Sequence, residues 1–372
     1  MQKLVVMYSE NRKNPTNTWS GTSYSLRQAL AENVEIIFVD LHEGKVLRLL
    51  DLLSVKVGRK HRSYVFGPLH DKLLQIKANH LLRDYKNIPV LEIANEVKIR
   101  SPYYLYQDLS LVVLPEIQES LKKKGILSCG GLRMELSDGE MKRKIQVQKD
   151  IYFSATKSFF MGKWVEKRMK KIYPEVSDRF LSVGGGINKE FVKKTNSDNL
   201  KEKLILFVGI DFERKGGEIV LDAFKILKKK VGNVKLIIAG PEKESMSKKN
   251  IDGVEILGNI NRKKLSDIFS KASLFCMPSE FEAYGLVFPE ALSFGVPCIG
   301  RNAYEMQYFI KEGENGYLLK EDKPEELSEI MYKVLNDADM KFEVEKNAEY
   351  IRREYSWSRV ADDICKVIYK VK

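Results

Sequence analysis

Short runs of β-branched and aromatic residues recur along the chain, separated by segments long enough for helices. In the first half they cover residues 4–9, 34–40, 63–67, 88–94, 151–155 and 180–183. In the second half they cover residues 204–210, 234–240, 254–258, 273–279, 297–300 and 316–319. Each run predicts a β-strand. Continuous apolar strands that alternate with helical segments are typical of parallel sheets covered by helices on both faces.

The helical segments and the chain length together predict two domains. Residues 217–230 and 262–272 carry apolar positions three and four apart, which indicates amphipathic helices. The polar stretch 191–203, which follows three glycines, reads as a linker. We therefore predict two doubly wound, Rossmann-like α/β domains in a chain of 372 residues, with ligands bound at the carboxyl ends of the strands and in the cleft between the domains.

Composition narrows the class of protein without naming an activity. Hydrophobic residues make up 44% and charged residues 31%, which excludes disordered and collagen-like chains. No stretch approaches the roughly 18 to 20 apolar residues that a membrane-spanning helix needs, and the N-terminal apolar run is too short for a signal peptide. The four cysteines show no Cys-x-x-Cys pair, so we expect reduced, mostly buried thiols in a cytoplasmic protein.

The net charge of +12 is concentrated in the first half of the chain. Residues 1–190 carry +11, whereas residues 191–372 carry +1. A basic half attracts an anionic substrate or an anionic membrane surface, or it is simply a solvated, lysine-rich surface. The basic positions 167–171 follow Phe159, Phe160, Met161 and Trp164. These four side chains either form the apolar face of a membrane-binding helix or pack into the core. Nucleic-acid binding is not favoured, because basic and aromatic residues do not alternate along any predicted strand.

Residues 273–300 form the most informative segment. A buried strand ends near Ser279, and a helix that begins at Pro289 and stops at Gly295 follows an acidic and aromatic loop. The unpaired amides of residues 285–288 then form an anion site suited to phosphate. Glu282 and Glu290 bracket these amides, and carboxylates beside a phosphate best serve as partners of ribose or sugar hydroxyls. Alone, each glutamate would read as a solvated loop residue or a helix-dipole partner; together they favour a binding site.

Residues 206–224 form a second candidate segment. A strand ends at Gly209, Arg214 and Lys215 lie on the loop, and two glycines let the backbone turn into the next helix. Two cations at the carboxyl end of a strand can neutralise a diphosphate leaving group. The alternative is an ordinary Lys-Gly-Gly turn. The segment lacks the Gly-Lys-Ser/Thr of a Walker loop.

The Lys215 loop, followed by Phe-Glu-x-Tyr-Gly-x-x-x-x-Glu-Ala-Leu at residues 281–292, resembles the donor half of the retaining GT-B glycosyltransferases of family four. This group is related to glycogen and sucrose synthases and to bacterial mannosyltransferases. Residues 17–22 resemble its glycine loop, and residues 151–174 resemble its last acceptor-domain strand and helix. Residues 355–364 resemble the helix that returns to the first domain. The resemblance implies an acceptor domain of residues 1–190 with 355–372, and a donor domain of residues 191–354.

The resemblance also assigns roles to residues. It implies that Lys215, with Arg214, grips the pyrophosphate, that Glu290 binds the ribose hydroxyls and that Glu282 binds the transferred sugar. The remaining implied donor contacts are the amides of Gly285, Leu286 and Val287, the closing Gly21, and the base-binding backbone of Gly258, Asn259 and Ile260. Ile210 and Asp211 stand where many relatives carry an arginine. Asp108 stands near the usual cleft histidine, and we assign it with Lys215 and Glu282 to catalysis; the alternative is an acidic cap on the helix or loop that begins near Leu109.

The implied enzyme moves a sugar from a UDP- or GDP-linked donor to a hydroxyl of a glycan, lipid-linked or protein-linked acceptor in cell-surface or envelope glycan synthesis. It retains the anomeric configuration and needs no metal or other cofactor, because fixed cations and amides take over the charge. The histidines show no metal-binding spacing, and Asp337 to Asp339 read as a turn. Peripheral contact with an anionic membrane is left open. The alternatives are a catalytically silent GT-B subunit that serves as a scaffold, and another reaction on the same fold, such as epimerisation.

Overall fold

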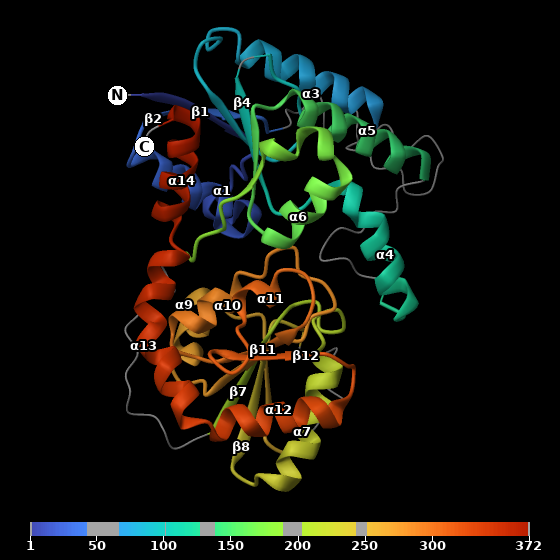
Figure 1. Ribbon diagram of the computed structural model, residues 1–372, viewed down its shortest axis with the longest axis vertical. Coiled ribbons are helices and arrows are strands. Elements are labelled where there is room, and N and C mark those ends of the chain that lie inside the picture. Colours follow the sequence, from blue (N-terminus) through green and yellow to red (C-terminus); the bar gives the residue numbers. More distant parts are fainter. Residues whose placement is uncertain are drawn as a thin grey trace. The chain divides into compact units, whose positions relative to one another are not determined.

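The computed structural model describes residues 2–42, 67–100, 102–126, 138–188, 203–242 and 251–370. The chain divides into two compact units (Figure 1). Unit 1 comprises Met1–Glu116, Arg133–Gly186 and Trp357–Lys372; unit 2 comprises Ile117–Leu132 and Ile187–Ser356. Residues 117–132, which the sequence assigned to the first domain, thus cluster with unit 2. The predicted strand 63–67, apart from Gly67, and the predicted linker 191–203, apart from Lys203, lie outside the described residues.

Unit 1 contains a parallel sheet with the strand order β2-β1-β3-β4-β5-β6. Its strands are β1 (Lys3–Tyr8), β2 (Glu35–Asp40), β3 (Val90–Ile93), β4 (Tyr103–Gln107), β5 (Lys157–Phe160) and β6 (Phe180–Ser182). Its helices are α1 (Thr22–Ala31), α3 (Pro68–Leu81), α5 (Asp138–Ser154), α6 (Lys163–Ile172) and α14 (Trp357–Tyr369), with the 3-10 helices η1 (Pro15–Gly21), η3 (Leu111–Val113) and η4 (Pro174–Arg179). Helix α4 (Leu114–Lys123) begins in unit 1 and continues into unit 2.

The predicted strand at residues 151–155 is wrong. These residues end the long helix α5, whose first turn carries Asp138 and Glu140 at the positive end of the helix dipole. Ile151 and Tyr152 are buried as part of the helix face that meets the core, so a short apolar run here marks a helix rather than a strand. The strand comes later, as β5, and the sequence reasoning also missed β4.

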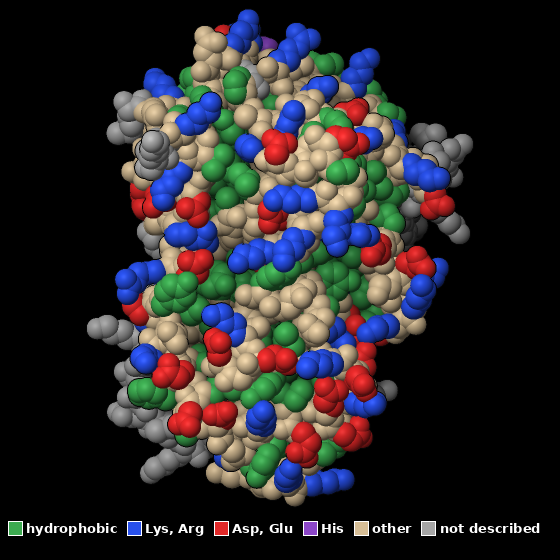
Figure 2. All heavy atoms as spheres, in the orientation of Figure 1, with side chains coloured by type: hydrophobic (Ala, Val, Ile, Leu, Met, Phe, Trp, Pro, Cys, Tyr) green, Lys and Arg blue, Asp and Glu red, His purple; other side chains and the backbone are tan. Residues whose placement is uncertain are grey.

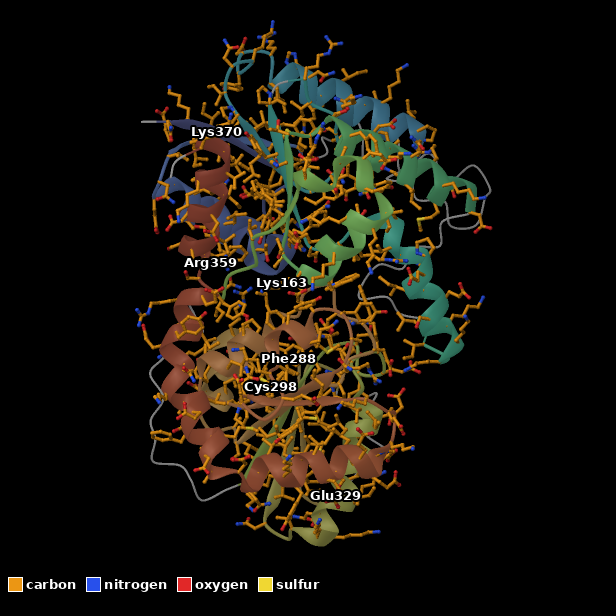
Figure 3. All side chains as sticks on the ribbon, in the orientation of Figure 1. Lys163, Phe288, Cys298, Glu329, Arg359 and Lys370 are labelled. Carbon is orange, nitrogen blue, oxygen red and sulfur yellow. The ribbon has the colours of Figure 1, made fainter. Side chains whose placement is uncertain are left out.

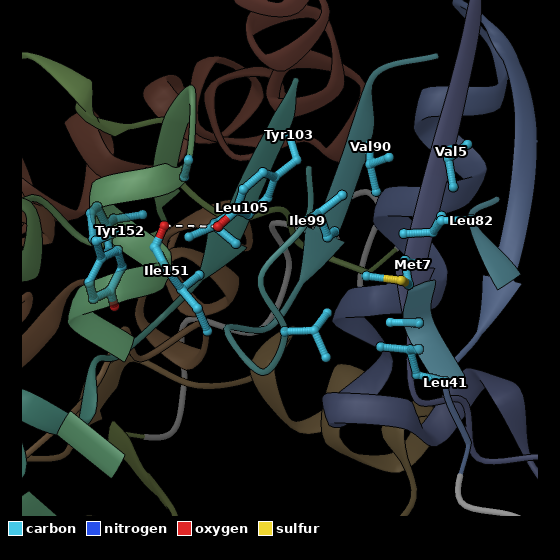
Figure 4. Close-up of a cluster of buried hydrophobic side chains, with 14 of the residues drawn as sticks. Val5, Met7, Leu41, Leu82, Val90, Ile99, Tyr103, Leu105, Ile151 and Tyr152 are labelled. Atoms are coloured by element: carbon cyan, nitrogen blue, oxygen red, sulfur yellow. Dashed lines mark hydrogen bonds between the residues drawn. The ribbon is translucent and has the colours of Figure 1, made fainter. Parts of the chain in front are cut away.

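The core of unit 1 packs one face of the sheet against α3, α5 and α6 (Figure 4). Tyr103 of β4 donates a hydrogen bond through its hydroxyl to the carbonyl of Ile151, 2.8 Å away. The aromatic residues before the basic cluster of α6 belong to this unit's interior: Phe159, Phe160 and Met161 are buried, and Trp164 packs against the core. Of the two roles considered for these side chains, packing into the core is therefore the one that the structure confirms.

The C-terminal helix returns to unit 1, as the sequence predicted. The buried residues of α14 recur at helical spacing, as expected for one apolar face. Figure 1 shows α14 beside α1, and the two helices pack together. Asn33 donates a hydrogen bond to Asp362 (2.8 Å), and Arg359, marked in Figure 3, donates one to the carbonyl of Val183 (2.6 Å). These contacts fix the end of the chain to the first unit.

Unit 2 contains a second parallel sheet, ordered β12-β11-β10-β7-β8-β9. Its strands are β7 (Lys203–Val208), β8 (Val234–Ala239), β9 (Val254–Gly258), β10 (Leu274–Cys276), β11 (Cys298–Arg301) and β12 (Gly316–Leu319). Its helices are α7 (Gly217–Lys230), α9 (Arg262–Phe269), α10 (Val287–Ser293), α11 (Met306–Phe309), α12 (Pro324–Asn336) and α13 (Ala338–Glu354). The chain winds from β7 towards β9 in one direction and from β10 towards β12 in the other. The topological switch point, where such sheets bind ligands, therefore lies between β7 and β10.

The interior of unit 2 is apolar and closely packed. Helices α7 and α12 lie side by side (Figure 1). Phe288 of α10 and Cys298 of β11, both marked in Figure 3, are fully buried. Cys276 and Cys298 are free and buried, and Cys365 is free and partly buried, as expected for reduced thiols; Cys129 lies outside the described residues.

Candidate active site

The loops that follow β7 and β10 bring the two predicted segments together at the switch point of unit 2. Lys215 lies on the loop after β7, and Glu282 lies on the loop after the neighbouring strand β10. The Lys215 Nζ atom lies 3.2 Å from the Glu282 Oε1 atom. The sequence predicted both residues, and the parallel sheet places them at one edge because adjacent strands end there together.

Two glycines make this approach possible. A β-carbon on Gly209 would lie 2.1 Å from the Lys215 side chain, so only glycine lets the lysine stem cross the end of β7. Gly216 precedes α7 with φ +78°, and a β-carbon there would lie 2.6 Å from the Pro278 carbonyl oxygen. Glycine adopts such a conformation without steric cost. The predicted turn into α7 is therefore also the contact between the two loops.

Arg214 is more deeply engaged than the sequence suggested. Its side chain is buried (5% exposed), and its Nε donates a hydrogen bond to Asp211 (2.8 Å). Its Nη1 donates to the Phe281 carbonyl and lies 3.3 Å from Glu282 Oε1. Asp211 thus serves as a partner of Arg214. The side chain of Lys215 keeps 18% of its surface exposed, which leaves it the more accessible of the two cations.

Glu282 is a buried carboxylate held in its ionised form. Burial is the largest influence and would raise its pKa, but the charges of Lys215 and Arg214, with hydrogen bonds from Lys215 and Ser279, hold the pKa below its ordinary value. Glu282 is therefore a fixed anion shared by two cations, of which Arg214 also pairs with Asp211. A ligand with negative oxygens near Lys215 would compete with Glu282 for that cation.

Glu290 has a different environment. It lies in the first turn of α10 with only 8% of its surface exposed. Burial raises its pKa to about 8, and the charges of Arg262 and Lys215 only partly oppose that rise. Within the described ranges, no hydrogen bond or ion pair of its carboxyl group is found. A buried polar group without a partner is costly, so a ligand that supplies one gains affinity.

The start of α10 differs from the prediction. The helix begins at Val287, two residues before Pro289, because Leu286 already has helical dihedral angles. The Phe288 amide donates to the Gly285 carbonyl (3.0 Å), so that amide is not open to a ligand as predicted. Gly285 has φ +92°, which a glycine tolerates at this turn. Over the part of the chain that the structure describes, no hydrogen bond from the Leu286 or Val287 amide is found.

The predicted base-binding backbone lies at the end of β9. Gly258 accepts a hydrogen bond from the Gly240 amide (2.8 Å), and Asn259 and Ile260 continue to the first turn of α9. Asn261 caps that helix by accepting from the Lys264 amide (2.8 Å). The first residue of α9 is Arg262, whose charge acts on Glu290. Sequence reasoning missed Arg262; its place directly after the predicted base-binding stretch was the available signal.

Two of the predicted site residues, Gly21 and Asp108, belong to unit 1. Gly21 ends η1 with φ +88° and precedes α1. Asp108 follows β4 and is partly buried. Burial raises its pKa to about 6, opposed by hydrogen bonds from its own amide, the Trp19 indole and the Leu109 amide. Trp19, itself at φ +47°, comes from the predicted glycine loop, so the structure brings that loop and Asp108 together. Sequence reasoning missed Trp19.

The described ranges contain neither a metal-binding cluster nor a membrane-spanning helix. No group of three or more His, Cys, Asp or Glu residues there is arranged to hold a metal ion. No helix in those ranges has the length and apolar content needed to cross a membrane.

The second half of the chain is similar to a known protein family. Residues 188–353 match the sequence model of the family described as Glycosyl transferases group 1. The phosphatidyl-myo-inositol mannosyltransferase of Mycobacterium leprae is 28% identical over 172 residues, which cover 44% of this chain and 46% of that protein. The chain spans about half the length of the curated relatives it matches.

Solved structures show the same fold over the whole chain. The crystal structure of WaaG, a glycosyltransferase involved in lipopolysaccharide biosynthesis, superposes with a TM-score of 0.67 at 16% identity and covers 98% of this chain and 99% of that one. HepE of Anabaena, solved in complex with UDP-glucose, superposes with a TM-score of 0.65 at 13% identity over 100% of both chains. The predicted GT-B fold, with two Rossmann-like units, is therefore confirmed.

Proposed function

We propose that this chain, which belongs to the GT4-like glycosyltransferases, transfers a sugar from a nucleoside diphosphate sugar to a hydroxyl group of an acceptor. Unit 2 would bind the donor at the switch point of its sheet. Lys215 would bind the diphosphate, Glu290 the ribose hydroxyls and Glu282 the transferred sugar. The base of the donor is uracil or guanine in this proposal, and the backbone at Gly258 to Ile260 would hold it.

The observation that carries the proposal is the Glu290 carboxyl group, nearly buried and without a hydrogen bond among the described residues, beside the Lys215–Glu282 ion pair at the switch point. A protein gains nothing in stability from such a carboxyl group, because burial raises its pKa without any compensating bond. A ribose supplies hydroxyl groups that can both donate to and accept from it. Lys215 and Glu282 lie on neighbouring loops and Glu290 on the helix that follows the second loop, at the edge where parallel sheets bind nucleotides.

The proposed chemistry follows from the charges. When the sugar departs, negative charge develops on the diphosphate, and Lys215 can stabilise it from a fixed position. Glu282 would then lose part of its pairing with Lys215 and gain the sugar hydroxyls as partners. We further propose that the sugar is transferred with retention of its anomeric configuration and without a metal ion. Asp108 of unit 1 would act on the acceptor side of the reaction.

The acceptor is proposed from the relatives and from the charge of unit 1. The names of two similar proteins refer to a phosphatidyl-inositol and to lipopolysaccharide, both anionic molecules with sugar-like hydroxyl groups. On the face that Figure 2 presents, Lys and Arg side chains gather on the part of unit 1 around α6. Lys163, Lys167, Arg168 and Lys171 of that region are exposed. We propose a glycan or lipid-linked acceptor that carries negative charge, in envelope glycan synthesis.

A panel of UDP- and GDP-linked sugars tests the proposal. The protein is incubated with each donor, and the released nucleotide is measured with and without candidate lipid-linked and glycan acceptors. We expect release from one donor class, faster with an acceptor, and α-configured product from an α-configured donor. If the protein binds free UDP or GDP but cleaves none of the nucleotide sugars, the result would contradict transfer. It would favour the catalytically silent subunit instead.

A further inference from the structure

Four charged side chains form a closed ring next to the loop that carries Glu282. Arg301, at the end of β11, pairs with Glu280 (2.6 Å between Nη2 and Oε1) and with Asp322 (2.5 Å between Nη1 and Oδ1). Lys124, directly after α4, pairs with the other oxygens of the same two carboxylates, at 2.6 Å each. Positive and negative groups alternate around the ring, so every charge has two partners of opposite sign.

The ring holds the backbone of the loop as well as its side chain. Arg301 donates through Nε to the Ser279 carbonyl (3.2 Å) and through Nη2 to the Pro278 carbonyl (3.1 Å). On the site side, Arg214 donates to the Phe281 carbonyl and its own carbonyl accepts from the Glu280 amide (2.8 Å). The short segment 278–282 is thus fixed from two directions.

Alternate residues of this segment point to different partners. The Glu280 carboxylate takes part in the ring, whereas the Glu282 carboxylate contacts Lys215 and Arg214. The two carboxylates lie one residue apart in a segment whose carbonyls accept hydrogen bonds from Arg301 and Arg214, so the position of residue 280 constrains the position of residue 282. A displacement of the Glu280 carboxylate would therefore move the Glu282 carboxylate relative to Lys215.

We propose that Lys124 and Arg301 are positioning residues for the donor site. The ring that they form with Glu280 and Asp322 holds the Glu282 carboxylate in contact with Lys215. This inference rests on the proposed function of the donor site for its catalytic meaning, although the structural coupling stands without it. The segment that supplies Lys124 lies more than 75 residues before the strands of unit 2 in the sequence, yet it clusters with that unit. The residues after α4 thereby become part of the donor site's framework.

The ring is more than an exposed ion pair. Arg301 and Glu280 are nearly buried, and Lys124 keeps 39% of its side chain exposed. Hydrogen bonds with Asp322 and Glu280 raise the pKa of Lys124 although its partial burial would lower it. Exposed pairs contribute little on their own, whereas networks of charges that share partners hold a defined geometry. Lys123, the neighbouring residue, offers the contrast: among the described residues it pairs with Glu119 alone, in the same helix, and both side chains are exposed.

The test compares Lys124→Met with Lys123→Met as the matched control. Amide hydrogen exchange of the full-length protein, without any ligand, is followed for residues 278–286, together with thermal unfolding. We expect K124M to accelerate exchange in this segment about fivefold or more while K123M leaves it unchanged, with no change in the exchange of unit 1. The conservative variant Lys124→Arg should restore the slow exchange, and Asp322→Asn should give an intermediate value.

Binding of UDP and GDP by calorimetry then links the ring to function. We expect K124M to weaken binding about three- to tenfold, and K124R and K123M to bind as the wild type does. If amide hydrogen exchange in residues 278–286 is equally fast in K124M, K123M and wild type, the inference is overturned. This holds whatever affinities for UDP and GDP are measured. If none of the proteins, wild type included, binds either nucleotide while loop exchange still follows the ring, the donor-site proposal fails and the coupling stands.

Discussion

The two units each contain a buried glutamate with a pKa raised to about 8, and the comparison separates a structural role from a functional one. Glu92 of β3 is fully buried; its Oε1 accepts hydrogen bonds from the Glu96 amide (2.7 Å) and the Val97 amide (3.3 Å), which fixes the turn after the strand, whereas its Oε2 has no partner among the described residues. Glu290 is 8% exposed, lies near the cations Lys215 and Arg262, and has no hydrogen bond of its carboxyl group among the described residues. Neither a raised pKa nor an oxygen without a partner therefore identifies a site by itself; the neighbouring cations and the place at the switch point distinguish Glu290.

The carboxyl edges of the two sheets also differ. At the edge of unit 2, Lys215 and Arg214 share the carboxylate of Glu282 at the switch point. At the edge of unit 1, the charges lie at the ends of β1 and β2, where Arg27 pairs with Glu10 (3.0 Å) and Arg12 with Asp40 (2.8 Å). After β4, near Asp108, the polar groups are neutral: Gln107 donates to the Tyr152 hydroxyl (2.6 Å), and Ser110 pairs with Gln148 (3.2 Å).

The largest effect is expected at Lys215. Replacing it with methionine removes the accessible cation that would stabilise the departing diphosphate, so kcat/KM for the donor should fall about 10²- to 10³-fold. Lys225→Met is the matched control, because the one ion pair of Lys225 found in the described part of the chain is with Asp222 of the same helix, α7, on an exposed surface. Steady-state release of the nucleotide measures both. Equal activity in the two variants would show that Lys215, at the carboxyl edge of unit 2, takes no part in the reaction.

The pH dependence of stability sharpens the comparison of the two glutamates. Between the ordinary pKa of 4.5 and about 8, the folded protein keeps a proton on Glu290 that the unfolded chain releases, so the free energy of unfolding falls as pH rises. Glutamine has no proton to lose. Between about pH 5 and pH 8, the free energy of unfolding of Glu290→Gln should therefore rise by on the order of 3 kcal/mol relative to that of wild type. The free energy of unfolding of Glu92→Gln should rise similarly.

Thermal unfolding at acid and alkaline pH checks this prediction, and added UDP or GDP tells the two variants apart. The nucleotide should stabilise E92Q as much as wild type, since Glu92 lies in the core of unit 1. It should stabilise E290Q less. Unfolding of E290Q that tracks wild type at every pH would show that the Glu290 carboxyl is not held as a neutral acid.

The smallest effect is expected at Asp108. Asp108→Asn should lower acceptor-dependent transfer about tenfold, the cost of one hydrogen bond to a hydroxyl group, and leave the affinity for UDP or GDP within twofold of wild type. Comparing transfer with donor hydrolysis in the absence of acceptor separates the two quantities. A loss of nucleotide affinity as large as that of K215M would place Asp108 in the donor site instead.

The sequence predicted unit 2 better than unit 1, for physical reasons. In unit 2 the strands alternate with amphipathic helices, and the predicted helix 217–230 has the observed bounds. In unit 1 the run at 151–155 belongs to a helix because Tyr152 is anchored by the core, which local pattern does not reveal. Strand β4 (Tyr103–Gln107) is rich in tyrosine, whose hydroxyl groups find partners only in the tertiary structure.

The sequence predicted the site residues that lie in motifs at the ends of strands. It did not predict the contacts between residues that only the folded structure brings together. Lys215, Glu282 and Glu290 follow from the motifs at the ends of β7 and β10. The engagement of Arg214 with Asp211 needs the loop geometry, and the action of Arg262 on Glu290 needs the sheet order that brings the end of β9 to the same edge. The ring of Lys124 and Arg301 joins residues 177 positions apart and leaves no local pattern.

Calorimetric titration of UDP and GDP into wild type, E290Q and E92Q tests the central claim most directly, because it asks whether the buried carboxyl of unit 2 faces a nucleotide. The account predicts that wild type and E92Q bind one nucleotide with equal affinity and that E290Q binds it at least tenfold more weakly. Equal affinity in all three proteins, or a loss in E92Q alone, would contradict it.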